Sequence, residues 1–338
     1  MNSRSAILFY AITSCILGAC SKGVWNDPYP SEFDASDVIY SSFSERPKRL
    51  DPVSSYSANE YQFIAQIYEP PLQYHYLLRP YTLIPQTSTE LPQVRYLNIN
   101  GEEISEEQTS KIAFSEYTIS IQQGIRYQPH PAFATDAQGK PMYLELKKDD
   151  LKDIYTLGDF PATGSHELTA ADYVYQIKRV ASPFLHSPIA GIMREYIVGF
   201  DEFRKQVDEL YRDQKTVWHD LRNLDLEGIT QTNRYTYRIR IKGQYPQLVY
   251  WLAMPFFSPM PWQAEKFYSQ AGMEERNISL NWYPVGTGPF MLTENNPNLR
   301  MVMEKNPNFR VERYPSEGMP EDRENGLLKD ANKELPFI

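Results

Sequence analysis

Hydrophobic and polar positions follow two periods along this chain of 338 residues. Apolar residues three or four positions apart mark one face of a helix, whereas strict alternation marks a strand. The predicted helices are residues 58–68, 168–183 and 247–253. The predicted strands are residues 38–40, 117–121, 234–242, 290–292 and 301–304, and the last two form a hairpin. Helices and strands are mixed, which predicts an α/β fold with α+β elements.

The second predicted helix has the clearest start signal. Thr169 can cap it, and Asp172 follows three residues later, as in a capping box. Within it, Val174, Ile177 and Val180 recur at helical spacing and predict the buried face.

The N-terminus has the layout of a secretory signal, with a basic residue, an apolar stretch and small residues. Arg4 precedes the apolar residues 6–16, and Leu-Gly-Ala leads to Cys20. The apolar stretch is shorter than the ~20 residues of a spanning helix. It resembles a bacterial lipoprotein signal, so residues 1–19 are the predicted signal peptide and Cys20 the lipidated residue. A simple cleaved signal or a transmembrane helix is the alternative. Residues 20–37 are polar and predict a tether.

Charge and cysteine content exclude several classes of function. The net charge of −9 argues against nucleic-acid binding and against adhesion to anionic lipid by charge. There are two cysteines, of which Cys15 leaves with the predicted signal and Cys20 is the predicted lipid anchor. The remaining chain then has no thiol for metal binding or catalysis, which fits an oxidising compartment outside the cytoplasm.

No motif predicts catalysis, a metal site or a cofactor. There is no G-x-S-x-G, and the five histidines are scattered without ligand spacing. Residues 286–289 (GTGP) resemble part of a phosphate-binding loop, but a third glycine is missing and Pro289 lacks a backbone donor. We therefore interpret this segment as a tight turn that leads into a strand, and we expect a protein that is not an enzyme.

Several short motifs, in order, resemble the family 5 solute-binding proteins, which are receptors of peptide- and nickel-type ABC importers. The family patterns are P-x-x-L-D-P, Y-E-G-L, Y-T-F-x-L-R-x-G-V-x-F, L-T-A-x-D-V-V-Y-S-x-x-R, G-T-G-P-Y and E-R-N-P-x-Y. The matching segments are 47–52 (PKRLDP), 67–72 (IYEPPL), 117–127 (YTISIQQGIRY), 168–179 (LTAADYVYQIKR), 285–290 (VGTGPF) and 304–309 (EKNPNF). In the second segment a glycine of the family pattern is replaced by proline.

The resemblance implies a periplasmic-binding-protein-like fold of type II, with a ligand held between two lobes. The expected first lobe comprises residues 38–69 and 200–312, and an accessory domain comprises residues 70–199. Residues 313–338 are the expected start of a second lobe that is largely missing, so the chain resembles a C-terminally truncated member. Whether it is a natural truncation or a fragment stays open. Residues 128–167 form an insertion, which we interpret as a solvated surface segment.

The resemblance also suggests ligand contacts. Tyr56, Ser57, Ala58 and Asn59 precede or begin the first helix, in a stretch that lines the cleft of peptide-binding relatives. A plain helix cap is the alternative. Met193 and Tyr196 lie in a second predicted wall segment, and core packing is their alternative. Trp251 and Trp262 flank a Phe-Phe pair that we interpret as core.

The resulting functional hypothesis is the substrate-binding lipoprotein of an ABC importer in the periplasm or cell envelope. It captures a peptide or similar small solute for permease subunits, acts as a monomer and needs no cofactor or metal. The alternative is a ligand sensor or envelope scaffold derived from the same family. The solute and the membrane face stay open.

A Cys20→Ser change tests the predicted anchor. Without a thiol to acylate, the exported protein should move from the membrane fraction to the soluble fraction of the cell envelope, as measured by fractionation and immunoblotting. The unchanged chain is the control, and continued membrane retention of the variant would contradict lipid anchoring at this residue.

Overall fold

The computed structural model describes residues 38–43, 45–213, 218–296 and 298–335. The chain divides into two compact units, residues 1–42 with 338 and residues 43–337. In the first unit, the predicted strand at residues 38–40 is wrong, since no strand forms there and Ile39 is 70% exposed. Three successive apolar residues predict burial, but a strand also needs ladder pairing, which their pattern does not specify.

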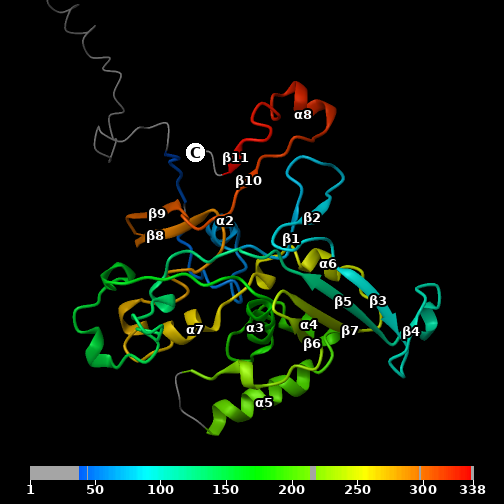
Figure 1. Cartoon of the computed structure of the whole chain (residues 1–338), viewed down its shortest axis with the longest axis horizontal. Helices are drawn as coiled ribbons and strands as arrows, with labels where there is room; N and C mark the ends of the chain where they lie inside the picture. Colours follow the sequence, from blue (N-terminus) through cyan, green and yellow to red (C-terminus); the bar gives the residue numbers. More distant parts are fainter. Residues whose placement is uncertain (1–37, 44, 214–217, 297, 336–338) are drawn as a thin grey trace, which may run out of the picture. The chain divides into compact units, whose positions relative to one another are not determined.

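The second unit contains all the named helices and strands (Figure 1). The α-helices are α2 (Ala58–Ile67), α3 (Ala170–Ala181), α4 (Ala190–Tyr196), α5 (Phe200–Asp213), α6 (Leu248–Trp251), α7 (Trp262–Tyr268) and α8 (Pro320–Glu324). The strands are β1 (Leu72–Tyr74), β2 (Leu83–Pro85), β3 (Gln93–Leu97), β4 (Glu103–Ile104), β5 (Phe114–Ser120), β6 (Ile229–Asn233), β7 (Thr236–Lys242), β8 (Phe290–Asn296), β9 (Arg300–Lys305), β10 (Glu312–Arg313) and β11 (Glu334–Leu335). The 3₁₀ turns are η2 (Thr109–Lys111), η3 (Pro131–Phe133), η4 (Lys148–Leu151), η5 (Leu157–Asp159), η6 (Leu221–Asn223), η7 (Pro255–Phe257) and η8 (Glu274–Arg276).

The remaining predicted elements are confirmed, with ends that differ by a few residues. The predicted helices correspond to α2, α3 and α6, and the predicted strands to β5, β7 and the antiparallel hairpin β8–β9. The Phe-Phe pair at residues 256–257 is buried, and Trp251 and Trp262 pack against the same core.

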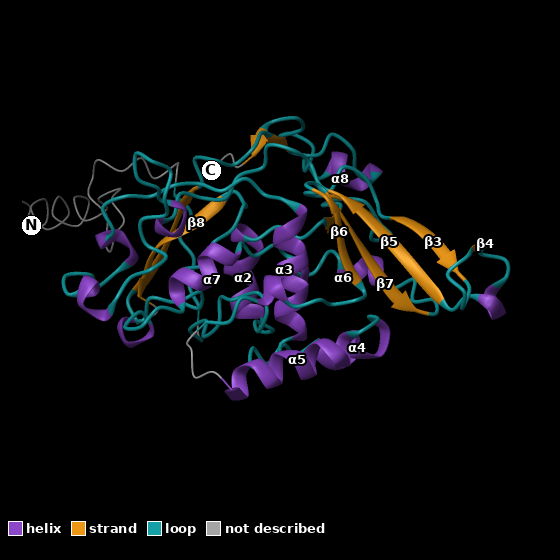
Figure 2. Ribbon diagram, turned by 60° about the horizontal axis from the view of Figure 1, so that its bottom comes forward, coloured by secondary structure: helices purple, strands orange, loops and turns teal. Residues whose placement is uncertain are grey.

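A five-stranded antiparallel sheet with the order β4-β3-β5-β7-β6 is the largest sheet of the described chain. One face of β5 and β7 is apolar and buried, and α3 packs on β6 and β7 (Figure 2). Tyr173 of α3 stacks on Tyr237 of β7, with ring centroids 5.4 Å apart and planes within 9°. The sheet thereby provides the support for α3.

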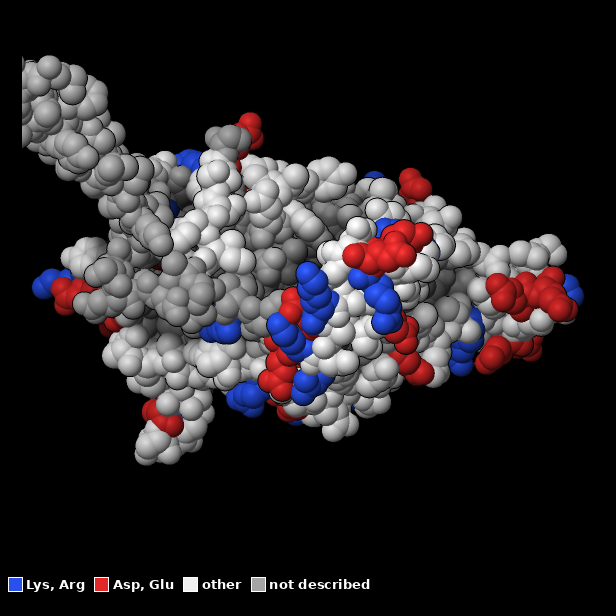
Figure 3. Space-filling view, turned by 90° about the horizontal axis from the view of Figure 1, so that it is seen from above, with Lys and Arg blue, Asp and Glu red and all other residues white. Residues whose placement is uncertain are grey.

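The other face of the sheet carries a charge cluster. Glu116 of β5 is 2% exposed and pairs with Arg95, Arg238 and Arg240 of the neighbouring strands at 2.5, 3.2 and 2.6 Å. Burial alone would raise the pKa of Glu116, but hydrogen bonds from Arg240 and Arg95 outweigh it and lower the pKa. Figure 3 shows basic and acidic side chains intermixed on the face that it presents.

Helix α3 starts as the sequence predicts. The Asp172 carboxylate accepts hydrogen bonds from the Thr169 backbone N–H at 2.8 Å and from the Thr169 hydroxyl at 3.2 Å. Its burial is wider than the predicted apolar face, because Gln176, Lys178 and Arg179 are also buried. The helix is therefore enclosed on nearly all sides and needs polar partners inside the protein.

Arg179 has those partners. Its side chain is 1% exposed, and its guanidinium donates to both carboxylate oxygens of Asp51, at 3.0 and 2.7 Å, and to Glu265 at 2.6 Å. Asp51 belongs to the chain before α2, and Glu265 belongs to α7. Tyr175 of α3 donates to Glu265 as well. One buried cation thus joins three segments that are distant in the sequence.

Residues 128–167 are not the simple solvated insertion that we predicted. Leu144, Leu151 and Phe160 are buried in the common core, whereas the charged run at residues 147–150 is exposed. The segment has irregular backbone and 3₁₀ turns, and it packs on α7 through η3. Its apolar residues supply enough burial to fix an irregular segment in place.

The predicted domain boundaries are not tested by this fold. Strand β5 lies in the predicted accessory domain and β7 in the predicted first lobe, yet they pair along their full length. One sheet therefore spans both predicted segments. The division at residues 69–70, 199–200 and 312–313 stays a prediction.

Replacing Arg179 by Met should reduce the free energy of unfolding by about 3–5 kcal/mol, because two carboxylates lose their buried partner. Denaturation by urea measures this. Arg194→Met is the matched control, since Arg194 is 61% exposed in its pair with Asp201 and should cost at most about 1 kcal/mol. Equal losses in the two variants would show that burial of the Arg179–Asp51–Glu265 triad is unimportant for stability.

Candidate functional site

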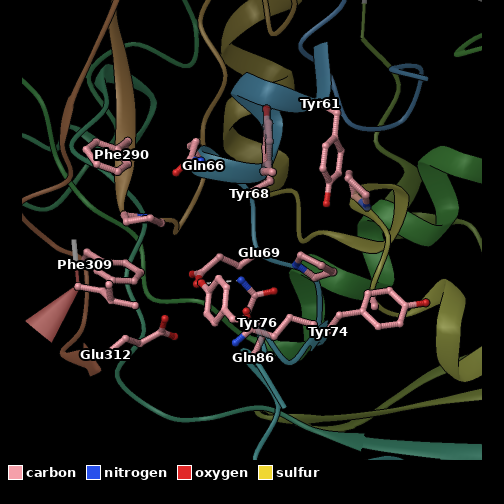
Figure 4. A pocket seen from close by; sticks show the side chains of 17 residues that line it. Tyr61, Gln66, Tyr68, Glu69, Tyr74, Tyr76, Gln86, Phe290, Phe309 and Glu312 are labelled. Carbon is pink, nitrogen blue, oxygen red and sulfur yellow. Dashed lines mark hydrogen bonds between the residues drawn. The ribbon is translucent and has the colours of Figure 1, made fainter. Parts of the chain in front are cut away.

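A cavity of about 360 Å³ opens beside the C-terminal half of α2 (Figure 4). Its size is at the lower end of the range for small-molecule sites, about 300–1,000 Å³. The lining comes from α2 and its exit, from β1 and the loops around β2, from the segment after α6, and from β8, β10 and β11. The lining residues are Tyr61, Ala65, Gln66, Tyr68, Glu69, Pro70, Gln73, Tyr74, Tyr76, Gln86, Ala253, Pro255, Pro289, Phe290, Phe309, Glu312 and Leu335.

The first wall follows from the geometry of α2. Ser57 accepts a hydrogen bond from the Glu60 backbone N–H at 3.4 Å, so the helix begins at a defined residue. Tyr61 and Ala65 are four residues apart and therefore share one helix face, which borders the cavity. Phe63, Ile64 and Ile67 are buried in the core on the other side of the helix.

The opposite wall approaches α2 because of two glycines. A Cβ atom at Gly286 would lie 1.8 Å from the Ile67 carbonyl oxygen, and one at Gly288 would lie 2.6 Å from that of Gln66. The Gly288 N–H donates to the Ile67 carbonyl at 2.9 Å, and Asn306 Nδ2 donates to the Gly288 carbonyl at 2.9 Å. The segment at 286–289 is thus the tight turn that the sequence predicts, and it places Pro289 and Phe290 in the lining.

A buried carboxylate lies at the centre of the lining. Glu69 is 1% exposed, and its Oε2 accepts hydrogen bonds from Thr287 Oγ1 and from Arg310 Nη1, both at 2.8 Å. Its Oε1 accepts one long contact, from Gln86 Nε2 at 3.5 Å. Burial alone would lower the pKa of Arg310, but the charge of Glu69 and then that of Glu312 outweigh it and raise the pKa. Arg310 therefore stays charged.

A second carboxylate lines the cavity at β10. Glu312 also pairs with Arg310. Burial, and then the charge of Glu69, raises the pKa of Glu312, whereas Arg310 acts in the opposite direction. Burial, followed by the charges of Glu312 and Glu69, also raises the pKa of the Tyr76 hydroxyl. The charges of Glu69 and Glu312 therefore both reach Tyr76, in the same part of the cavity.

Aromatic rings form much of the remaining wall. In Figure 4, Phe290 and Phe309 lie on one side of Glu69, and Tyr61 and Tyr74 on the other. Tyr76 stacks on Tyr314 at 6.3 Å between ring centroids. Tyr74 is 42% exposed and Tyr61 is 54% exposed, so their rings are open to a ligand.

The structure places the predicted contact residues of the first helix at the start of α2, outside the lining of the cavity. Tyr56, Ser57 and Ala58 are exposed at the start of α2, and Asn59 donates to the Glu45 carbonyl at 3.3 Å. Tyr56 also packs on Phe256, with centroids 6.2 Å apart. Ser57 acts as the helix cap, which was the alternative. A ligand role for the four residues stays a prediction.

The other two predicted contacts lie elsewhere. Met193 is 0% exposed and packs in the core, and Tyr196 stacks on Tyr245 with centroids 3.9 Å apart. Neither lines the cavity.

The central carboxylate Glu69 and its two hydrogen-bond donors were missed, although they lie in or beside the quoted motifs. Glu69 belongs to the segment 67–72, Thr287 to the segment 285–290, and Arg310 directly follows the segment 304–309. A glutamate and an arginine in or beside separate motifs carry opposite charges, and this is a signal that the two motifs can meet in space.

The described residues contain no group of three or more His, Cys, Asp or Glu side chains arranged to hold a metal ion. Within the same described ranges, none of the helices combines the length and apolar character that a membrane span needs.

The family comparison covers slightly less than half of the chain. Residues 163–323 match the model of the bacterial extracellular solute-binding proteins, family 5 Middle. No curated protein matches this sequence.

Solved structures resemble the described fold over most of this chain. The substrate-binding domain of an oligopeptide ABC transporter from Bacillus anthracis superposes with a TM-score of 0.50 at 15% identity, covering 82% of this chain and 39% of that chain. The murein tripeptide binding protein MppA of Escherichia coli gives 0.48 at 16% identity, covering 79% and 38%. The periplasmic binding protein DppA of Helicobacter pylori, in complex with the peptide STSA, gives 0.48 at 16% identity, covering 84% and 43%.

The mixed helices and sheets, with the fold shared by the Bacillus anthracis structure, define a periplasmic-binding-protein-like fold. The similarity to family 5 of the bacterial extracellular solute-binding proteins lies in residues 163–323, slightly less than half of the chain. The chain spans about two fifths of the length of the solved chains that it resembles.

Replacing Gly286 by Ala should separate the two walls of the cavity, because the new methyl group overlaps the Ile67 carbonyl. We expect a loss of about 1–3 kcal/mol in the free energy of unfolding, measured by urea denaturation. Gly191→Ala in α4 is the control, since no atom lies within 4 Å of its added Cβ and the change should stabilise the helix by about 0.5–1 kcal/mol. A neutral Gly286→Ala variant would contradict the close approach.

Proposed function

We propose that this chain is the substrate-binding part of an ABC importer, and that it captures peptides or similar small solutes without catalysis. The observation that carries the proposal is the family match over residues 163–323, because it covers α3, β7 and the turn that forms one wall of the cavity. The similar structure from Bacillus anthracis is the substrate-binding domain of an oligopeptide ABC transporter, which supports the peptide class.

The cavity suits a peptide in two respects. Aromatic rings provide flat apolar surfaces that accept side chains of different shapes. The side-chain amides of Gln66, Gln73 and Gln86 at its lining offer both donors and acceptors, which match the C=O and N–H groups of a peptide backbone.

The proposed working site is the cell envelope. Lipidation at Cys20 would hold the protein near a membrane, with residues 20–37 as its tether, and permease subunits would receive the solute. The protein would act as a monomer. The sensor or scaffold alternative shares the ligand and differs in lacking a permease partner.

Peptide uptake by the source bacterium tests this proposal. Deletion of the gene should lower the import of isotope-labelled trialanine, and the wild-type gene should restore it. A Tyr61→Ala, Tyr74→Ala double variant should restore import only weakly, because the rings that border the cavity are removed. Tyr155→Ala is the matched control, since Tyr155 is 70% exposed and lies outside the cavity.

Binding of trialanine to the purified protein, measured by calorimetry, separates the outcomes. Binding without any effect of deletion on import would favour the sensor. If trialanine does not bind and deletion of the gene does not change import, the proposed peptide class is contradicted.

A further inference from the structure

We propose that the cavity beside α2 receives a positively charged group of the ligand, an organic ammonium such as a peptide α-amino group or a lysine side chain. That a peptide carries this ammonium group rests on the proposed function, whereas the preference for a cation rests on the cavity alone.

The charges at the cavity favour a cation. Among the described residues that line it, the charged ones are Glu69 and Glu312, and none is basic. One guanidinium, that of Arg310, pairs with both carboxylates and is not part of the lining. Two carboxylates and one guanidinium leave a local charge of −1, so a monovalent cation completes the neutralisation.

An acceptor is available for the ligand. Glu69 Oε2 has two good donors at 2.8 Å, whereas Oε1 has only the contact to Gln86 at 3.5 Å, near the limit of a hydrogen bond. A carboxylate oxygen accepts about two hydrogen bonds, and an ammonium group offers up to three donors. A buried, charged acceptor with spare capacity at a cavity wall is costly when it is left without a donor.

The aromatic walls favour the same ligand chemistry. Ring faces attract cations within about 6 Å of their centroids, and the attraction grows when water is excluded. Tyr61 and Tyr74 lie across the cavity from Phe290 and Phe309, with Glu69 between them (Figure 4). An anion at the same place would meet two carboxylates and the negative ring faces, so the cavity favours an ammonium group over a carboxylate.

The experiment compares three peptides that differ only in charge. Trialanine amide carries an α-ammonium, N-acetyl-Ala-Lys-Ala amide carries a side-chain ammonium, and N-acetyl-trialanine amide is neutral. Calorimetry with the purified protein should show that the neutral peptide binds about tenfold more weakly than at least one cationic peptide. The preferred cationic peptide identifies which source of ammonium the cavity takes.

Variants tie the preference to the cavity. Glu312→Gln should reduce the ratio of cationic to neutral affinity towards one, and Tyr76→Leu should reduce it in part. Glu317→Gln is the matched control, because it removes the same charge from an exposed position near Glu312 that lies outside the lining. Circular dichroism shows whether each variant is folded. A ratio that stays unchanged in folded Glu312→Gln, or falls equally in Glu317→Gln, overturns the proposal.

A small probe separates this proposal from the peptide hypothesis. n-Hexylammonium should shift the ring signals of Tyr61, Tyr74 and Tyr76 in NMR spectra of protein labelled with ¹³C in tyrosine, whereas 1-hexanol should not. If hexylammonium produces these shifts and no peptide binds, the cation site holds and the peptide class fails. If the peptides bind without charge preference and hexylammonium has no effect, the peptide class holds and the cation site fails.

Discussion

The buried contact of Arg179 with Asp51 and Glu265 is the constraint on which the rest of the fold depends. A guanidinium that is 1% exposed must keep both carboxylates, because each missing partner would leave an uncompensated charge in the core. The triad thereby fixes α3 against the segment before α2 and against α7. Since α3 also stacks on β7, the sheet, the first helix and the C-terminal half of the unit adopt one arrangement.

The cavity depends on that arrangement through short backbone contacts rather than through its own side chains. Gly286 and Gly288 bring the start of β8 against the end of α2, and Asn306 binds the turn from the next strand. Thr287, between the two glycines, then reaches Glu69. The sequence suggests that this turn is purely structural, yet it supplies a hydrogen-bond donor to the central carboxylate. The same short segment therefore serves both the packing of α2 and the lining of the cavity.

Local signals predicted much of the secondary structure. Capping at Thr169 and Asp172, the helical spacing before Tyr68, and alternation near Tyr237 all depend on neighbours within a few residues. Long-range pairing was not predictable in this way. Glu69 and Arg310 are 241 positions apart, and no period links them. Burial of Leu151 in the insertion was missed for the same reason, because a charged run beside it suggested solvent and its partners lie far along the chain.

The same distinction explains why the predicted ligand contacts and the cavity differ. The prediction at Tyr56 rested on the family resemblance and on its place before a helix, where free backbone donors favour anionic or carbonyl groups. The cavity lies past the middle of that helix, where side chains rather than helix-end donors form the lining. There the lining groups are carboxylates and aromatic rings instead of backbone donors, and these favour cations. At the start of α2, the backbone N–H groups of Tyr56 and Ser57 donate to the Glu60 carboxylate at 3.3 Å, so the helix satisfies its own first donors.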